Sequence, residues 1–231
     1  MFWFDPMYLV FALPALLLAF YAQIKVQSAY NTYLRIQNRR GITGLQAAQQ
    51  LLLANGLGHV NIEGVPGQLT DHYDPRSDTL RLSEPIARGS SVAALGVVAH
   101  EIGHALQDNQ QYMPMRLRTG LVPIVNVGSW LGPIIFFLGL LMQIDSIAWL
   151  GLVLFAGAAF FAVLTLPIEL NASQRAMRML TTSGLVVDAE EARGARAVLD
   201  AAALTYVAAV AQAISTLLYY SFLLLSGRRR R

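Results

Sequence analysis

Four long apolar segments set the strongest limit on what this chain can fold into. They run from Phe2 to about Ile24, from Leu121 to Ile144, from Ile147 to Ile168 and from about Ala202 to Leu225. Each is close to the roughly 20 residues with which an α-helix crosses about 30 Å of hydrocarbon. Over the chain, 55% of residues are hydrophobic and 13% are charged, against about 45 to 50% and about 25% in ordinary soluble domains. We therefore expect a mainly α membrane protein with about four transmembrane helices, located as a multi-pass protein in a cell membrane.

The first segment also has the length of a secretory signal peptide. It lacks a basic stretch before the apolar run and a convincing small-residue cleavage site after it, so we expect it to remain as a membrane helix. The second and third segments are separated only by Gln143 to Ser146. A connection this short predicts a tight helical hairpin.

Residues 100 to 104 read HEIGH and carry the most specific chemical signal in the chain. On an α-helix, positions i and i+4 share one face, so His100 and His104 would point the same way. Two imidazoles in this arrangement can bind one Zn²⁺ ion, and Glu101 between them can take a proton from a water at the metal. This HExxH pattern is typical of zinc hydrolases, and the alternative is a helix that carries surface histidines.

The residues around HEIGH predict a packed helix. Ser90 or Ser91 can serve as its N-cap, and apolar residues recur at helical spacing at Val92, Leu95, Val98, Ile102 and Leu106. A helix with this much apolar surface is largely buried, and buried histidines and glutamates need partners. The context therefore favours a metal site over surface histidines.

The ligand types available to such a site follow from the composition. The chain has no cysteine, so neither a disulfide framework nor a thiolate site is possible, and a metal must rely on histidine and carboxylate ligands. The net charge of +3 includes four arginines at the C-terminus, Arg228 to Arg231. In a membrane chain such residues mark lipid headgroups and orientation, and we expect the bilayer rather than nucleic acid as a partner.

A catalytic zinc site usually has three protein ligands, so HEIGH leaves one to be found. Position 110 is glutamine, which excludes the pattern with a third histidine six residues after the second. Glu169 is the strongest candidate, because a carboxylate at the end of the third apolar segment is unfavourable beside the bilayer unless it is used. The alternatives are His59, His72 or another carboxylate of the polar regions, with Glu169 as an interfacial residue that faces headgroups.

Other polar residues have weaker assignments. His72 and Tyr73 lie on a predicted strand, where either could donate a hydrogen bond to an oxyanion or help to seat substrate, and a half-exposed strand residue is the alternative for His72. We expect His59 to be structural or exposed. Arg175, about two turns beyond Glu169, could stabilise a carboxylate near the metal, against the alternative of a solvated or lipid-facing arginine.

Local patterns predict the elements of the polar regions. Thr43 and Gln46 form a capping box at the start of a helix that Gly56 ends. Short β-like runs follow at 60–63, 68–73 and 79–83, the last two as a hairpin. Asp188, with Glu191 as capping partner, opens a helix that runs on into the fourth apolar segment.

These elements divide the chain into five expected parts. They are a membrane helix (1–24), a zincin-like α+β catalytic domain with the HExxH helix and a small β-hairpin (25–120), a membrane hairpin (121–168), a region with the third ligand and a connecting helix (169–201), and a last membrane helix with a basic tail (202–231). Two spans separate the polar regions, so both face one side. The number of basic residues near the membrane favours the cytoplasm for that side, whereas the terminal arginines argue for the reverse.

Four ordered blocks of the sequence resemble one known family. AHEIGHALQ, LTDHYDPRSDTLRLS, LPIELNASQRA and VLDAAALTYVAA together are similar to the YugP-type neutral zinc metallopeptidases, which are integral membrane proteins of bacteria. The resemblance extends over nearly the whole chain. It implies a zinc peptidase related in outline to HtpX and CAAX-prenyl proteases, with His100, His104 and Glu169 as zinc ligands in a gluzincin-type site and Glu101 as the catalytic base.

We therefore expect metal-assisted hydrolysis of peptide bonds in membrane-associated polypeptides, because both parts of the site lie near apolar segments. An edge strand of the hairpin at 68–83 could pair with an extended peptide substrate. One alternative is a membrane scaffold or partner-binding protein with a closed zinc site and no turnover. Another is a zinc hydrolase that acts on a lipid or a different amide.

Overall fold

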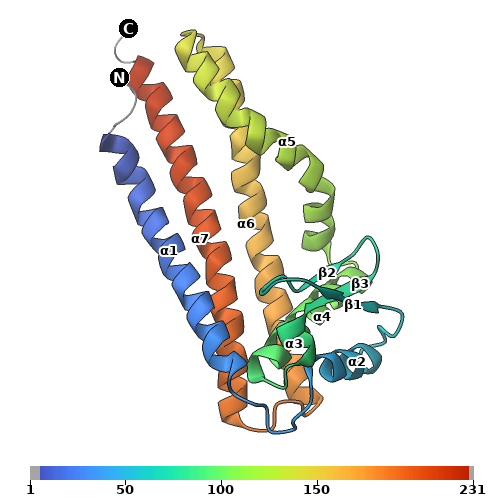
Figure 1. The fold of residues 1–231 in the computed structure, drawn as a ribbon. Coiled ribbons are helices and arrows are strands. Elements are labelled where there is room, and N and C mark those ends of the chain that lie inside the picture. Colours follow the sequence, from blue (N-terminus) through green and yellow to red (C-terminus); the bar gives the residue numbers. More distant parts are fainter. Residues whose placement is uncertain (1–5, 229–231) are drawn as a thin grey trace. The chain divides into compact units, whose positions relative to one another are not determined.

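The computed structural model of the protein describes residues 6–228 (Figure 1). The first four residues of the first predicted apolar segment and the arginines at 229–231 lie outside the described residues. The elements in chain order are α1 (Pro6–Leu34), α2 (Gly44–Ala54), β1 (Asn61–Val65), β2 (His72–Asp74), β3 (Thr79–Ser83), α3 (Glu84–Arg88), α4 (Val92–Asn109), α5 (Met113–Leu141), α6 (Asp145–Thr182) and α7 (Ala189–Arg228).

Four helices in the described part of the chain, α1, α5, α6 and α7, are long and apolar enough to cross a membrane. The predicted mainly α fold with about four such helices is confirmed. The helices extend past the apolar segments, because their polar ends continue the same hydrogen-bonded backbone. In particular, α6 runs from Asp145 to Thr182 without a break. It therefore carries the third apolar segment and Glu169 on one helix.

The chain divides into two compact units. The first comprises Met1–Ala22, Arg116–Pro167 and Thr205–Arg231. Within it, α5 and α6 approach closely at glycines: a Cβ at Gly139 would lie 2.3 Å from the backbone nitrogen of Ala148. Small residues let helix backbones come together in this way, which is common among membrane helices.

The second unit comprises Gln23–Met115 and Ile168–Leu204 and contains a small sheet with strand order β1-β3-β2. Strands β2 and β3 are antiparallel, with Tyr73 opposite Leu80, so the predicted hairpin is confirmed. β2 begins only at His72, later than predicted, because Gly67 and Leu69 have positive φ angles that interrupt the extended backbone. The parallel pairing of β1 with β3 and the short helix α3 were not predicted.

The HEIGH helix, α4, lies in the core of the second unit. Ser91 is its N-cap, and the Ser91 side chain accepts a hydrogen bond from the backbone N–H of Ala94. The apolar residues predicted to form its packed face are all buried: Val92, Leu95, Val98, Ile102 and Leu106. The prediction of a packed helix is therefore confirmed.

The predicted starts of α2 and α7 are both present, but the capping residues of α7 differ from the prediction. At α2, Thr43 and Gln46 form the full capping box. At α7, Asp188 accepts hydrogen bonds from the backbone N–H groups of Glu190 and Glu191. The Glu191 carboxylate, however, accepts from the backbone N–H groups of Val187 and Arg39. Glu191 therefore ties the start of α7 to the segment after α1 instead of closing a capping box.

Candidate metal centre

Helices α4 and α6 bring three potential metal ligands together. His100 and His104 lie one turn apart on α4, with ring centroids 4.8 Å apart, and Glu169 approaches from α6. The Nε2 atoms of His100 and His104 are 3.3 Å and 3.4 Å from Oε2 of Glu169. These three residues form the one His and carboxylate group among residues 6–228 whose donor atoms could hold a metal ion.

Gly103 permits the close approach of the two helices at this point. A Cβ at position 103 would lie 2.7 Å from the carbonyl oxygen of Ala172 on α6. Ala172 follows Glu169 by three residues, so the two positions lie near each other on the surface of α6. The contact at Gly103 therefore places the Glu169 carboxylate within reach of both histidines.

The second nitrogen of each imidazole also has a partner. Nδ1 of His104 lies 3.0 Å from Oε1 of Gln107, and Nδ1 of His100 lies 3.2 Å from Oγ of Ser173. Partners of this kind hold a ligand ring in orientation and leave Nε2 toward the metal. Sequence reasoning missed Gln107 and Ser173. Their positions, three residues after His104 and four after Glu169, place them on the same helix faces as the ligands, which is the signal that the sequence offers.

The donor set fits a zinc ion. Zinc binds imidazole nitrogen and carboxylate oxygen at about 2.0 to 2.2 Å, so two ligands of a tetrahedral ion lie about 3.4 Å apart. Both Nε2 to Oε2 distances agree with this spacing. Glu169 is 2% exposed, and a buried carboxylate requires cationic or hydrogen-bonding partners. A metal held by His100, His104 and Glu169 would satisfy that requirement.

Glu101 lies on α4 between the two histidines, and the hairpin supports its carboxylate. Its Oε2 accepts a hydrogen bond from the backbone N–H of Tyr73, at 3.0 Å. Burial raises the pKa of Glu101 above that of an ordinary glutamate, although the neighbouring His100 and His104 and the Tyr73 bond act to lower it. For His104, burial lowers the pKa, but the hydrogen bond to Glu169 and the charge of Glu101 outweigh it and leave the pKa raised.

The hairpin itself is fastened to α4 through Tyr73. The Tyr73 hydroxyl lies 2.9 Å from Oδ1 of Asp78 and 3.1 Å from Oδ2 of Asp108, the latter on α4. Burial and these two carboxylates raise the pKa of Tyr73. Because β2 is an edge strand, its outer backbone is not covered by another strand of the sheet. On that edge, the backbone N–H of Tyr73 points to the Glu101 carboxylate.

The remaining histidines lie apart from the three donors. His72 is exposed, and its Nδ1 is 2.8 Å from the carbonyl oxygen of Thr70. His59 is exposed in the turn before β1. Neither belongs to the group that could hold a metal ion. A role for His72 in seating substrate stays a prediction.

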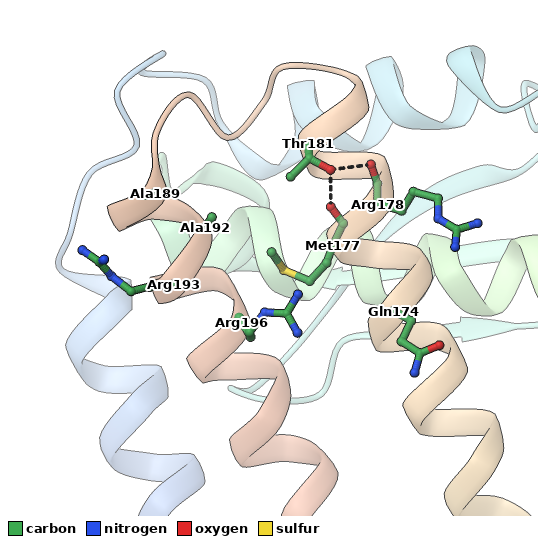
Figure 2. Close-up of a pocket in the computed structure, with 8 residues that line it drawn as sticks. All are labelled: Gln174, Met177, Arg178, Thr181, Ala189, Ala192, Arg193 and Arg196. Atoms are coloured by element: carbon green, nitrogen blue, oxygen red, sulfur yellow. Dashed lines mark hydrogen bonds between the residues drawn. The ribbon is translucent and has the colours of Figure 1, made fainter.

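A cavity of about 530 Å³ lies between the end of α6 and the first turns of α7 (Figure 2). Its lining consists of Gln174, Met177, Arg178, Thr181, Ala189, Ala192, Arg193 and Arg196. Figure 2 shows the Arg196 guanidinium directed between the two helices, with Arg178 and Arg193 pointing to either side. None of the three donor residues lines this cavity, so the donor set, not the cavity, identifies the candidate site.

Comparisons with known proteins show which family the chain belongs to. Residues 8–225 match the family described as "Putative neutral zinc metallopeptidase". The chain is 41% identical over 222 residues to the "Putative membrane protease YugP" of Bacillus subtilis (strain 168), covering 96% of this chain and 98% of that protein. No solved structure matched the chain. The resemblance seen in the sequence is thereby confirmed, and the chain belongs to this family of neutral zinc metallopeptidases.

Proposed function

We propose that the protein is a zinc-dependent endopeptidase of the membrane with a gluzincin-type site. His100, His104 and Glu169 hold the metal, and Glu101 is the general base. One observation carries the proposal: the Glu169 carboxylate of α6 meets both HExxH imidazoles within hydrogen-bonding distance. Membership of a zinc metallopeptidase family supports peptide hydrolysis over the other reactions that an HExxH helix could serve.

The chemistry is divided between the metal and the chain. Bound zinc would polarise the scissile carbonyl and lower the pKa of a water. Glu101 takes a proton from the attacking water and passes it to the leaving amine. The backbone N–H of Tyr73 holds one carboxylate oxygen of Glu101, which leaves the other to act as the base.

The edge strand β2 supports extended polypeptides as substrates. An edge strand can add a peptide as a further strand, with main-chain hydrogen bonds supplying much of the affinity. The Tyr73 N–H on this edge is held by Glu101, so a peptide paired along the edge through its other outward backbone groups would pass close to the catalytic base. Glu169 directly follows the apolar run of α6, which supports membrane-associated polypeptides as the substrate class. In the proposed division of the chain, 25–120 is the catalytic domain and 169–201 supplies the third ligand.

Replacing Glu101 by glutamine tests the proposed function. Glu101→Gln keeps the shape of the side chain but removes the base, and loss of a general base lowers the rate by about 10² to 10⁴-fold. Purified full-length protein is incubated with a membrane-inserted reporter polypeptide, and cleavage and zinc content are measured. Glu84→Gln, an exposed glutamate on α3 that pairs with Arg88, is the matched control and should cleave normally. A Glu101→Gln protein that cleaves as fast as the control would refute the proposal.

A further inference from the structure

Gln107 is a buried side chain whose amide group makes a complete set of hydrogen bonds. It is 0% exposed. Its Nε2 donates to the carbonyl oxygen of Ile168 at 2.8 Å and to Oδ1 of Asn171 at 3.0 Å, and its Oε1 lies 3.0 Å from Nδ1 of His104. Both hydrogens and the oxygen of the amide are therefore used. Gln107 connects the HEIGH helix to α6 beside Glu169.

Arg175 holds the far end of this network. Its Nε donates to Oδ1 of Asn171 at 2.7 Å, and its Nη1 donates to Oε1 of Gln110 at 2.6 Å. The guanidinium also lies over the ring of Tyr112, 5.8 Å from the ring centroid. A guanidinium has donors and no acceptor. Asn171 must therefore turn its oxygen, and not its NH₂ group, toward Arg175.

The orientation of Asn171 bears on the orientation of Gln107 and, through it, on the tautomer of His104. Oδ1 of Asn171 and the carbonyl oxygen of Ile168 are both acceptors, so Gln107 must turn its NH₂ group toward α6. The amide oxygen of Gln107 then faces His104. Because this oxygen can only accept a hydrogen bond, Nδ1 of His104 must carry a proton. In a neutral imidazole the lone pair is then on Nε2, the nitrogen that faces Glu169.

The other ligand histidine lacks such a constraint. Nδ1 of His100 faces the Ser173 hydroxyl, which can rotate to donate or to accept. The two histidines of HEIGH therefore differ. The surrounding protein specifies the tautomer of His104, whereas the Ser173 hydroxyl can accommodate either tautomer of His100.

We propose that Arg175 and Gln107 are positioning residues of the metal centre, which act through Asn171 to fix His104 in the tautomer whose Nε2 is free to bind a metal. The inference rests on the proposed metal site and assigns a role to Arg175, about two turns beyond Glu169. Metal binding then requires no tautomer change at His104. Removal of the network restores the alternative tautomer and weakens metal binding.

Zinc affinity gives the first test. Full-length Glu101→Gln protein in detergent serves as the parent, and zinc is titrated in competition with a chromophoric chelator. We expect Gln107→Met to bind zinc about 10 to 100-fold more weakly, the usual effect of removing a partner of a ligand histidine. Arg175→Met should weaken binding by a smaller factor. Asn171→Asp keeps acceptor oxygens toward both neighbours and should bind as the parent does.

Arg178→Met is the matched control, because Arg178 lies on the same helix and its guanidinium has no partner within residues 6–228. It should leave zinc affinity unchanged. Parental affinity in Gln107→Met would overturn the whole proposal, and parental affinity in Arg175→Met would overturn the role of the arginine. Arg175 is only partly buried, so its variant is informative even if Gln107→Met fails to fold.

The tautomer gives a second test that needs neither zinc nor turnover. Histidine is labelled with ¹⁵N, and imidazole spectra of the metal-free parent are recorded at a pH where the rings are neutral. His104, assigned by the loss of its signals in His104→Gln, should show a proton on Nδ1 in the parent and in Arg178→Met. In Gln107→Met the Nε2–H form should appear, and in Arg175→Met it should appear to a smaller extent, because the Ile168 carbonyl still accepts from Gln107. An Nε2–H ring in the parent would refute the inference whatever the result of the cleavage assay.

Discussion

Gly103 packs directly against the backbone of Ala172, so closely that a Cβ at position 103 would lie 2.7 Å from the Ala172 carbonyl oxygen. Real Cβ atoms do not approach an oxygen so closely, so the two helices must separate before any larger residue fits. The glycine of HEIGH thus sets the spacing between the helix that carries the histidines and the helix that carries Glu169.

Enlarging Gly103 should therefore damage both stability and metal binding. We expect Gly103→Ala to lower the free energy of unfolding by about 1 to 3 kcal/mol, as overpacking of a tight core does, and to weaken zinc binding because α6 is displaced. Thermal unfolding and chelator competition measure the two effects. Gly96→Ala is the control on the same helix, since its Cβ would meet Ala195 at an ordinary 3.5 Å. Equal behaviour of the two variants would contradict the spacing role of Gly103.

Glu169 should be required for metal binding. Glu169→Ala removes one of three donors, and we expect a loss of zinc affinity of more than about 100-fold, the upper end found for residues that merely support a ligand. Glu169→Gln keeps the size of the side chain but not its charge, and should also bind poorly. Zinc content after gel filtration, measured by atomic absorption, checks this. Full zinc occupancy in Glu169→Ala would assign the third ligand to another residue.

The hairpin next to the site should resist acid through Asp74. The hydrogen bond from Arg81, followed by that from the backbone N–H of Arg76, lowers the pKa of Asp74 from 3.8 to about 2. A pKa lowered by folding contributes stability that is present above about pH 3.8 and is lost as the pH falls through about 2. Metal-free Asp74→Asn should therefore have a lower melting temperature than the parent at pH 7. The difference between the two melting temperatures should narrow only below pH 3.8. If the two melting temperatures became equal near pH 6, the lowered pKa of Asp74 could not be the cause of the difference.

Orientation in the membrane is open to a reporter experiment. The basic residues near the membrane on the side of the proposed site outnumber the four at the C-terminus. They are Lys25, Arg35, Arg39, Arg40, Arg116, Arg118, Arg175, Arg178, Arg193 and Arg196. This count favours a cytoplasmic active site, which with four spans puts the C-terminus outside. Alkaline phosphatase fused after Arg231 should then be active in bacterial cells, and a green fluorescent protein fused there should be dark. The reverse pair of results would place the site on the outer face.

The parts of the fold that could be predicted depend on short-range spacing. The pairing of His100 with His104 and the caps at Thr43 and Ser91 follow from residues within one or two turns of each other. The shortened β2 could not be foreseen, because positive φ at Leu69, a non-glycine residue, arises from packing around it. The same limit applied to Gln107, whose partners Ile168 and Asn171 are more than sixty residues away. Its place three residues after His104, on the same helix face, was the signal available.

The position of Glu169 beside the two histidines was predictable for a different reason. An acidic residue at the end of an apolar segment is conspicuous against its surroundings. Ser173 and Arg175 lacked that contrast, because hydroxyl and basic residues are ordinary at the polar end of a helix that leaves the bilayer. Only the arrangement of α4 against α6 distinguishes them from solvated neighbours such as Arg178.

The separation of the donors along the chain has a consequence for biosynthesis. During translation the HEIGH helix leaves the ribosome while the residues that follow position 168 are still unmade. A nascent chain at that stage has His100 and His104 but neither Glu169 nor the Asn171 and Arg175 that orient His104. The proposed metal centre can be completed only after two further apolar segments have been synthesised. The order of the sequence thus delays assembly of the site until most of the chain has been made.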